Sequence, residues 1–430
     1  MEIKRPAYLK KLIEVKENGR VKVITGIKGC GKTYLLCNIY KNYLLNNEVS
    51  EDHIIEIHLD NDSFVEYRNP FKLKEYIMSK VVDNECHYVF IDEIQESITI
   101  DNPYIPNGED KITFVDVLLS LMKKKNIDVY VTGSNSKMLT KDIPTQFRDR
   151  GDNIHVHPLS FREIVGLFDS KEEAWRFYSH FGGMPYMYTI NNNEARITYL
   201  NNLFIEKYLK DIVTNYNIKN STEILDTLLN FTASNIGSLT NATKLSKRFL
   251  LEMNIHISSE TITNYLEYFE DAFLLYKALR YNIKGAKYFS SPCKFYYADI
   301  GLRNSRIDFK QTLEETHIME NIIYNDLIAR GYSVDVGFIE DRVKEDNNAR
   351  KQLEVNFIVN HVNARYYIQS AYSLPTEEKF NQVRRPFLKI RDSFRKIVIV
   401  FQDIIPRYDE YGIYYIGLFD FLCSDEPLKF

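Results

Sequence analysis

The chain has 430 residues, too many for one compact core, and its 44% hydrophobic and 27% charged residues are the balance of an ordinary folded protein. The formal net charge is −4, which excludes a global basic field for nucleic acid, so any such site has to be a local patch. No stretch approaches the roughly 20 apolar residues of a membrane span. We therefore expect no membrane contact. The five cysteines are scattered without a CxxC pair, which favours a reduced, cytoplasmic setting.

A glycine-rich motif comes first in chain order. Residues 24–33 read ITGIKGCGKT, and within them Gly26–Thr33 fits the pattern G-x-x-x-x-G-K-[ST]. The preceding RVKVIT alternates like a buried strand, and apolar residues recur at helical spacing from Leu35 to Leu44. This context predicts strand, loop and helix in succession, whereas a plain turn before a helix is the alternative interpretation.

The glycine-rich loop is expected to bind phosphates. Glycines let backbone N–H groups converge on phosphate oxygens, and a helix N-terminus adds partial positive charge. The side chain of Lys32 would reach the β- and γ-phosphates, and Thr33 would hold Mg²⁺. The predicted nucleotide-binding residues are Gly26, Ile27, Lys28, Gly29, Cys30, Gly31, Lys32 and Thr33.

Two acids follow a second apolar strand. HYVFIDEIQ, residues 87–95, ends its apolar run at Asp92 and Glu93. After a phosphate loop, Asp92 is expected to bind Mg²⁺ through water and Glu93 to deprotonate the attacking water. A solvated strand end is the alternative. A third strand, DVYVTGSNS, ends in Ser134 and Asn135, either of which is a candidate sensor of the γ-phosphate, with a simple loop as the competing interpretation.

The motifs together resemble a known family. GIKGCGKT, VFIDEIQ and DVYVTGSNSKML, followed by QFRDRGDNIHVHPLSFREI, resemble a large family of prokaryotic AAA-type ATPases with a C-terminal domain of unknown function. FGGMPYM, KDI, KFYYADIGLRN and YYIQSAYSL extend the resemblance over nearly the whole chain. The glycine-rich loop binds phosphates and does not distinguish adenine from guanine. ATP as the nucleotide is therefore implied by the family resemblance alone.

The resemblance also implies a homo-oligomer. In the family, an arginine before the PLSF segment resembles an arginine finger that reaches a neighbouring subunit's nucleotide. Here Arg148 and Arg150 occupy that stretch, with Asp149 where the family pattern has glycine. We expect Arg150 to act in catalysis in this way; ordinary surface charge is the alternative for both arginines.

The middle of the chain is predicted to be helical. Residues 158–220 suit the helical lid of an AAA-type protein, and 221–306 read as three helices and an extended pair, which resembles a winged helix. Its exposed Thr261, Thr263 and Asn264 are candidates for DNA contact, whereas domain packing is the alternative. Acids lie around the third helix, and the expected wing offers basic residues. The acids are Glu260, Glu267, Glu270 and Asp271, and the basic residues are Arg280, Lys284 and Lys287.

The last part, residues 307–430, is predicted as helix, three strands, helix and strand. This order resembles the restriction-endonuclease-like PD-(D/E)XK fold, whose metal is held by strand acids. Here Glu320 remains on the helix and Glu354 flanks the second-strand position, but Asn356, Gln369 and Ala371 occupy the positions of the strand acids and lysine. An amide removes the charge that a hard cation needs, so a non-cutting scaffold is expected.

One basic cluster stands out in the last part. It comprises Arg384, Arg385, Lys389, Arg391, Arg395 and Lys396. Such a run is usually a solvated face, and binding of nucleic-acid phosphates is the alternative, centred on Arg384, Arg385 and Lys389.

These expectations combine into one prediction. The fold is α/β: an AAA-type P-loop NTPase core (1–157), a helical lid (158–220), a winged-helix-like domain (221–306) and a restriction-endonuclease-like C-terminal domain (307–430). The function is Mg²⁺-dependent ATP hydrolysis coupled to the degraded nuclease-like domain, in nucleic-acid transactions or defence. A nucleotide-locked interaction module with negligible turnover is the first alternative, and an active DNA nuclease is the second.

Overall fold

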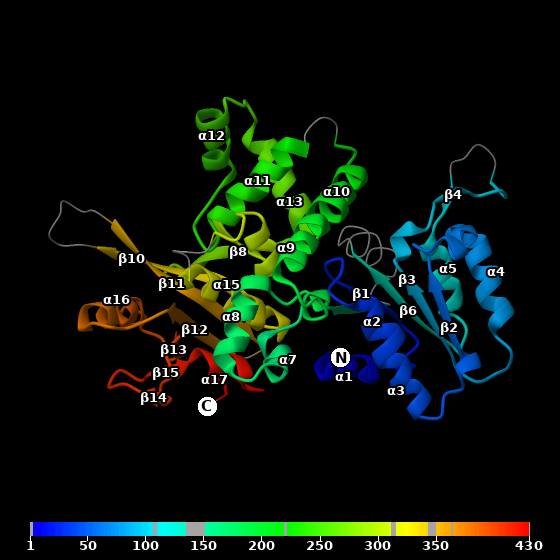
Figure 1. The fold of residues 1–430 in the computed structure, drawn as a ribbon, viewed down its shortest axis with the longest axis horizontal. Coiled ribbons are helices and arrows are strands. Elements are labelled where there is room, and N and C mark those ends of the chain that lie inside the picture. Colours follow the sequence, from blue (N-terminus) through cyan, green and yellow to red (C-terminus); the bar gives the residue numbers. More distant parts are fainter. Residues whose placement is uncertain are drawn as a thin grey trace. The chain divides into compact units, whose positions relative to one another are not determined.

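The structure is a computed structural model that describes residues 3–105, 110–134, 151–218, 222–310, 315–342, 350–362 and 364–429 (Figure 1). Contacts divide the chain into two compact units. Unit 1 is Met1–Pro158 with Asp271–Phe273, and unit 2 is Leu159–Glu270 with Leu274–Phe430. The four domains expected from the sequence are finer than these two units, and they stay a prediction.

Unit 1 is built on a five-stranded sheet in the order β2-β3-β6-β1-β7, with every pair parallel. The strands are β1 (Val21–Thr25), β2 (Ile54–His58), β3 (His87–Asp92), β6 (Ile127–Gly133) and β7 (Gly151–His155). The sequence predicts β1, β3 and β6 correctly, whereas β2 and β7 were not foreseen. Because all strands are parallel, their carboxyl ends meet at one edge of the sheet, as in other ligand-binding α/β sheets.

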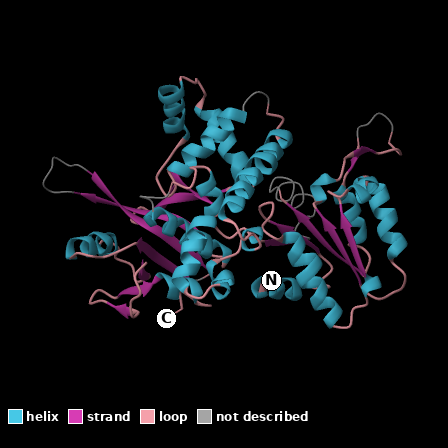
Figure 2. Ribbon diagram, viewed as in Figure 1, coloured by secondary structure: helices cyan, strands magenta, loops and turns pink. Residues whose placement is uncertain are grey.

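Helices cover both faces of this sheet (Figure 2). On one face lie α4 (Pro70–Lys80) and α5 (Phe114–Leu121), which form one buried apolar cluster with alternate strand residues such as Val89. On the other face lies the helical stretch of α2 (Lys32–Tyr34), η1 (Leu35–Tyr40) and α3 (Lys41–Asn46). Its Tyr40 ring packs 5.1 Å from that of Tyr130. Strand side chains alternate between faces, so each strand contributes to both layers.

The remaining elements of unit 1 are short. They are α1 (Pro6–Glu14), the 3₁₀ turns η2 (Glu51–His53), η3 (Asp62–Arg68) and η4 (Ile94–Glu96), and the small ladder of β4 (Ile100–Asp101) and β5 (Lys111–Ile112). Helix α5 begins at a capping box in which Thr113 and Asp116 satisfy each other's backbone N–H groups, which explains where the predicted helix starts.

Unit 2 contains an eight-stranded sheet in the order β14-β15-β13-β12-β11-β10-β8-β9. The strands are β8 (Leu275–Asn282), β9 (Lys287–Tyr297), β10 (Ser333–Arg342), β11 (Arg350–His361), β12 (Ala364–Ala371), β13 (Arg395–Val400), β14 (Arg407–Tyr408) and β15 (Ile413–Gly417). β10, β11 and β12 pair antiparallel, β12, β13 and β15 pair parallel, and β8 joins β10 in parallel. The β8–β9 hairpin, expected as a wing, therefore extends the sheet of the C-terminal strands.

The helices of unit 2 include those expected from the sequence, together with Ile300–Ser305 and Leu418–Cys423, which were not foreseen. They are α7 (Phe161–Ile164), α8 (Lys171–Phe181), α9 (Asn193–Asn202), α10 (Lys210–Asn215), α11 (Thr222–Ser234), α12 (Ala242–Met253), α13 (Ser259–Asp271), α14 (Ile300–Ser305), α15 (Glu315–Ala329), α16 (Glu377–Leu388) and α17 (Leu418–Cys423). The succession α15, β10, β11, β12, α16 and β13 is the one expected from the sequence. Likeness to a winged helix or to the nuclease fold stays a prediction.

Two of the quoted motifs meet in unit 2. The backbone N–H of Gly183, from FGGMPYM, donates to Asp299 Oδ2 at 2.6 Å, and Asp299 Oδ1 accepts from the N–H of Leu302 at the start of α14. Gly182 has a φ of +74°, and a Cβ there would lie 2.3 Å from Asp299 Oδ1. These glycines are therefore required by packing, as the sequence suggests for a turn.

Within the described ranges, no helix combines the length and the apolar character needed to cross a bilayer.

Candidate nucleotide-binding site

The glycine-rich loop connects the carboxyl end of β1 to the start of α2. Gly29 and Gly31 have φ values of +85° and +96°, a region that residues with a Cβ rarely adopt. A Cβ on Gly26 would lie 2.2 Å from the carbonyl oxygen of Val156, at the end of the neighbouring strand β7. The predicted strand–loop–helix is thus the observed one, and its glycines are those that the backbone needs.

Lys32 lies inside the curl of this loop. Its side chain is 3% exposed, and its Nζ donates hydrogen bonds to the carbonyl oxygens of Gly26 at 3.0 Å and Ile27 at 3.4 Å. The loop backbone therefore encloses a buried positive charge. A buried cation at a helix N-terminus, framed by glycines, is the arrangement that attracts an anionic group such as phosphate.

Thr33 and Asp92 meet beside the loop. The Thr33 hydroxyl donates to both carboxylate oxygens of Asp92, at 3.0 and 2.9 Å. Thr132 also donates to Asp92 Oδ1, at 2.5 Å, and His58 Nδ1 lies 3.6 Å from Oδ2. The carboxyl ends of β2, β3 and β6 supply His58, Asp92 and Thr132, and α2 supplies Thr33. A hydroxyl and a carboxylate side by side are hard oxygen donors, the kind that Mg²⁺ prefers.

The charge of Asp92 follows from these contacts. Burial raises its pKa, but the interactions with His58, Thr132 and Thr33 outweigh burial and place the pKa below its ordinary value. The interaction between His58 and Asp92 also raises the pKa of His58, and it outweighs burial, which lowers that pKa. Asp92 is therefore an anion at neutral pH, as a metal-binding carboxylate has to be.

Glu93 is the second acid of the predicted pair. It is 8% exposed and has a φ of +52°. Its Oε2 accepts hydrogen bonds from the side-chain amide of Gln95 and, at 3.3 Å, from the Ser134 hydroxyl, while its backbone N–H donates to Thr132 Oγ1. The carboxylate is thus fixed at the carboxyl end of β6. An uncommon backbone conformation with such fixation is typical of functional positions.

Some residues of the site carry no sequence signal. Arg5 is 3% exposed, and its guanidinium donates to the carbonyl oxygens of Cys30, in the loop, and His157. His58, Thr132 and Gln95 were missed as well, although the first two close apolar strands, where ligand-binding groups of parallel sheets gather. The predicted Asn135, Arg148 and Arg150 lie outside the described residues.

Comparison with known proteins places the chain in a family. It is 30% identical over 406 residues to a protein of Haemophilus influenzae described as uncharacterized. The aligned region covers 92% of this chain and 93% of the relative. The chain belongs to the family of that Haemophilus protein. A second relative, the uncharacterized protein MJ1544 of Methanocaldococcus jannaschii, is 26% identical over 413 residues, 90% of this chain and 83% of its own.

Two family models match parts of the chain. Residues 18–165 match the family described as AAA domain, and residues 172–313 match a domain of unknown function (DUF8612). Unit 1 therefore contains an AAA-type ATPase domain. Among solved structures, the Walker-type ATPase PABY2304 of Pyrococcus abyssi is 14% identical over 71% of this chain and 96% of its own, with a TM-score of 0.49.

Unit 2 of this AAA-type protein has its own cluster of charged side chains, which includes two acids of the predicted nuclease-like site. Lys294, on β9, donates from Nζ to Glu320 Oε1 at 2.9 Å and to Glu354 Oε1 at 2.6 Å. The Tyr296 hydroxyl also donates to Glu320 Oε1, and the Asn356 amide donates to Glu320 Oε2 at 2.8 Å. The ammonium group thus lies between the two carboxylates. Burial lowers the pKa of Lys294, but the two carboxylates raise it by more than burial lowers it. The pKa of Lys294 is therefore above its ordinary value.

Asn356 and Gln369, the amides at the positions where the sequence resemblance predicts strand acids, are hydrogen-bonded within the sheet. Asn356 Oδ1 accepts from the N–H of Ser370 at 3.0 Å, and Gln369 exchanges hydrogen bonds with the backbone of β11 through its Oε1 and Nε2. Each amide therefore has a structural partner between β11 and β12. These hydrogen bonds give Asn356 and Gln369 a structural role in joining β11 to β12.

The basic residues proposed for DNA contact are partly engaged. Arg385 and Lys389 lie 3.3 and 3.4 Å from the carboxylate of Asp341, and Arg384 lies 3.6 Å from Glu377. Including Arg280 in an exposed wing patch was wrong. It is 7% exposed and donates to Gln352, because β8 pairs with β10 and buries it inside the sheet.

Proposed function

We propose that this protein binds ATP and Mg²⁺ at the loop Gly26–Thr33 and hydrolyses the nucleotide. The observation that supports this proposal most is the meeting of Thr33 with Asp92, beside a loop that already encloses the Lys32 ammonium. An anion-binding loop and a hard oxygen pair at the same edge of the sheet are the two halves of a nucleotide–metal site.

Each residue has a role in the proposed reaction. Backbone N–H groups of the loop and the Lys32 ammonium would bind the phosphates and orient them. Thr33 and Asp92 would hold Mg²⁺, which supplies charge neutralisation at the phosphates when bound. Glu93 would take a proton from the attacking water, and Arg150 would add positive charge from a second subunit, as the family resemblance implies.

Binding is the first step to test. Titration calorimetry of the full chain with ATP and with GTP, each with Mg²⁺, measures affinity and base preference together. Lys32→Ala should weaken ATP binding by about 10- to 100-fold, because it removes the buried charge that meets the phosphates. Lys80→Ala, which removes an exposed lysine at the end of α4, should bind like wild type. Equal affinity in wild type and Lys32→Ala would refute the proposed site.

We further propose that unit 2 retains a scaffold that does not cut DNA. Lys294 supplies the positive charge between Glu320 and Glu354 that a bound cation would otherwise have to provide. A hydrolytic metal would have to displace this ammonium, and the two positions that should add acids are amides. The bound nucleotide would then control a binding surface in unit 2, for which Arg384, Arg385 and Lys389 or the winged-helix-like part are the candidates. Contact with DNA through that surface, and a role in nucleic-acid transactions or defence, stay predictions.

A second function, a nucleotide-locked switch, is favoured by two contacts of Glu93. Gln95 and Ser134 both hydrogen-bond the Glu93 carboxylate, so the proposed base is occupied and has to be released before it accepts a proton from water. In that case, basal turnover is low and a partner supplies the release. Gln95→Ala should then raise ATP turnover several-fold; unchanged or lower turnover in this variant would rule out the lock.

A further inference from the structure

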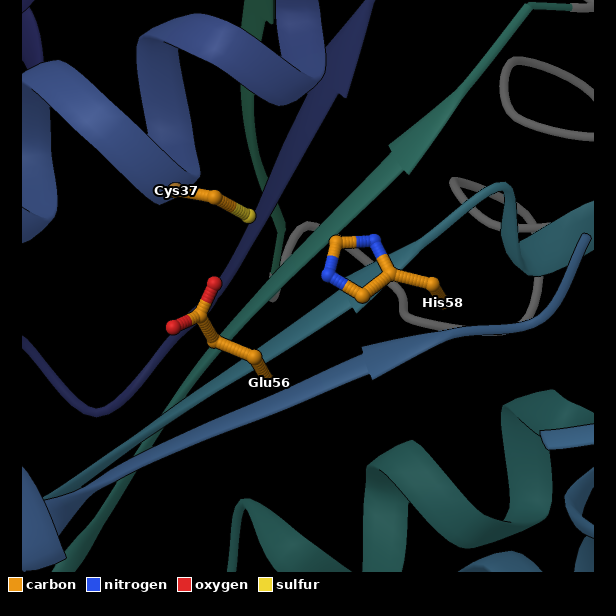
Figure 3. A group of neighbouring side chains, drawn as sticks. All are labelled: Cys37, Glu56 and His58. Carbon is orange, nitrogen blue, oxygen red and sulfur yellow. The ribbon is translucent and has the colours of Figure 1, made fainter. Parts of the chain in front are cut away.

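Three side chains of unit 1 that the proposed function does not require form a close group. Cys37, Glu56 and His58 each offer one ligand atom, and these atoms all lie within 4.8 Å of one another. Cys37 comes from η1, whereas Glu56 and His58 are alternate residues of β2 and so face the same side of the sheet. Figure 3 shows the thiol sulfur, the carboxylate and one ring nitrogen of His58 turned toward one another.

The chemistry of this group differs from that of the Mg²⁺ site. Thiolate, imidazole and carboxylate are the ligands of zinc, whereas Mg²⁺ prefers oxygen alone. Zinc bonds are about 2.0–2.3 Å long, so modest side-chain rotations bring the three atoms to bonding distance. All three residues are partly exposed, which gives an ion and a fourth, solvent ligand access.

A second observation concerns the other ring nitrogen of His58. Its Nδ1 faces Asp92 Oδ2 at 3.6 Å, which leaves Nε2 for the group drawn in Figure 3. A histidine that binds a metal almost always donates its other N–H to a carboxylate or carbonyl, which fixes the ring and makes the ligand more basic. Nδ1 of His58 faces the Asp92 carboxylate in this orientation, at 3.6 Å, which is longer than a hydrogen bond.

Two features oppose an ion at this group, and both leave it possible. Lys41 Nζ lies 2.7 Å from Glu56 Oε1, but the second carboxylate oxygen remains for an ion. Burial raises the pKa of the Cys37 thiol, so zinc has to displace its proton, as it does whenever a thiol becomes a ligand.

We propose that Cys37, Glu56 and His58 form a Zn²⁺ site, and that the bound ion slows ATP hydrolysis through His58 and Asp92. Without zinc the His58 ring is free to turn away when Mg²⁺ binds, whereas Nε2 on zinc would fix the ring with Nδ1–H directed at Asp92 Oδ2, so that it competes for the carboxylate that Mg²⁺ requires. The site would make the AAA-type domain responsive to zinc. Binding of zinc does not depend on the ATPase, whereas its effect on turnover rests on the proposed function.

Cobalt tests the site without nucleotide. Co²⁺ added to the full chain should give the intense thiolate-to-metal absorption band and the visible bands of a low-coordinate ion, and Zn²⁺ should displace them. Cys37→Ser should lose the thiolate band. Cys86→Ser, another partly buried cysteine of unit 1 outside the group, should keep it. Absence of the band in wild type, or its persistence in Cys37→Ser, would overturn the proposed site.

Turnover tests the coupling. At saturating MgATP, Zn²⁺ should slow hydrolysis by about tenfold or more in wild type and in Cys86→Ser, and much less in Cys37→Ser. Equal inhibition in all three would mean that zinc acts on the nucleotide itself, and the coupling would be refuted. If wild type hydrolyses no ATP, the proposed function fails, while the cobalt band still decides the zinc site.

Discussion

The Thr33 hydroxyl lies 2.9 Å from Asp92 Oδ2, although the two residues are 59 positions apart in the sequence. Thr33 lies in the first turn of the helix that follows β1, and Asp92 ends β3, which is two places from β1 in the sheet. Parallel strands carry both to the same edge, so the fold itself assembles the pair that we propose for Mg²⁺.

Removing the hydroxyl should raise the requirement for Mg²⁺. Thr33→Ala leaves Asp92 with Thr132 and His58 but takes away one oxygen donor of the proposed ion. We expect the Mg²⁺ concentration for half-maximal ATP turnover to rise about 10- to 100-fold. Thr33→Ser keeps the hydroxyl and should stay close to wild type. An unchanged Mg²⁺ titration for Thr33→Ala would contradict the assignment.

Loss of the buried lysine should destabilise unit 2. Lys294→Met leaves Glu320, 4% exposed, without its cation, and removing one partner of a buried pair costs about 3–5 kcal/mol. The chain has one tryptophan, Trp175, which lies in α8, so its fluorescence during urea unfolding reports on unit 2. Lys287→Met, on the exposed part of the same strand, is the matched control and should change little.

A double variant separates charge from packing at this position. Lys294→Met with Glu320→Gln removes both charges and should recover part of the lost stability. If the double variant is as unstable as Lys294→Met, then shape, and not an unpaired carboxylate, explains the loss.

Asp299 should make the stability of unit 2 depend on pH. Burial raises the pKa of Asp299 to about 6, against three backbone N–H groups that lower it, and the ordinary value is 3.8. The folded carboxyl therefore keeps its proton where the unfolded one has lost it. Its contribution to stability is complete below the unfolded pKa and declines as pH rises through about 6.

Asp299→Asn tests this dependence. The amide cannot ionise, so the decline that Asp299 contributes between about pH 4 and pH 6, at most about 1.4 kcal/mol per pH unit, should disappear from the unfolding of unit 2 followed by Trp175 fluorescence. The variant should also be less stable by about 1–3 kcal/mol, because an NH₂ group replaces an acceptor among N–H donors. An identical pH profile for both proteins would contradict the shift.

The sequence was a good guide where a local pattern carries the chemistry. The loop Gly26–Thr33, the acids Asp92 and Glu93 and the order of elements after Glu315 all follow from spacing and periodicity. Contacts between distant segments do not. His58 ends a short strand without a motif, and the contact of Lys294 with Glu320 depends on a hairpin joining a sheet formed later in the chain. Arg280 was misjudged for the same reason.

Steady-state ATP hydrolysis by the full chain tests the central claim most directly, with wild type compared to Glu93→Gln. We predict Mg²⁺-dependent turnover in wild type and a loss of about 100-fold or more in Glu93→Gln with ATP affinity retained, because the amide keeps the shape but cannot accept the proton of water. Equal turnover in both proteins, or tight ATP binding without turnover in wild type under every condition, would contradict the account of an ATPase that uses Glu93 as its base.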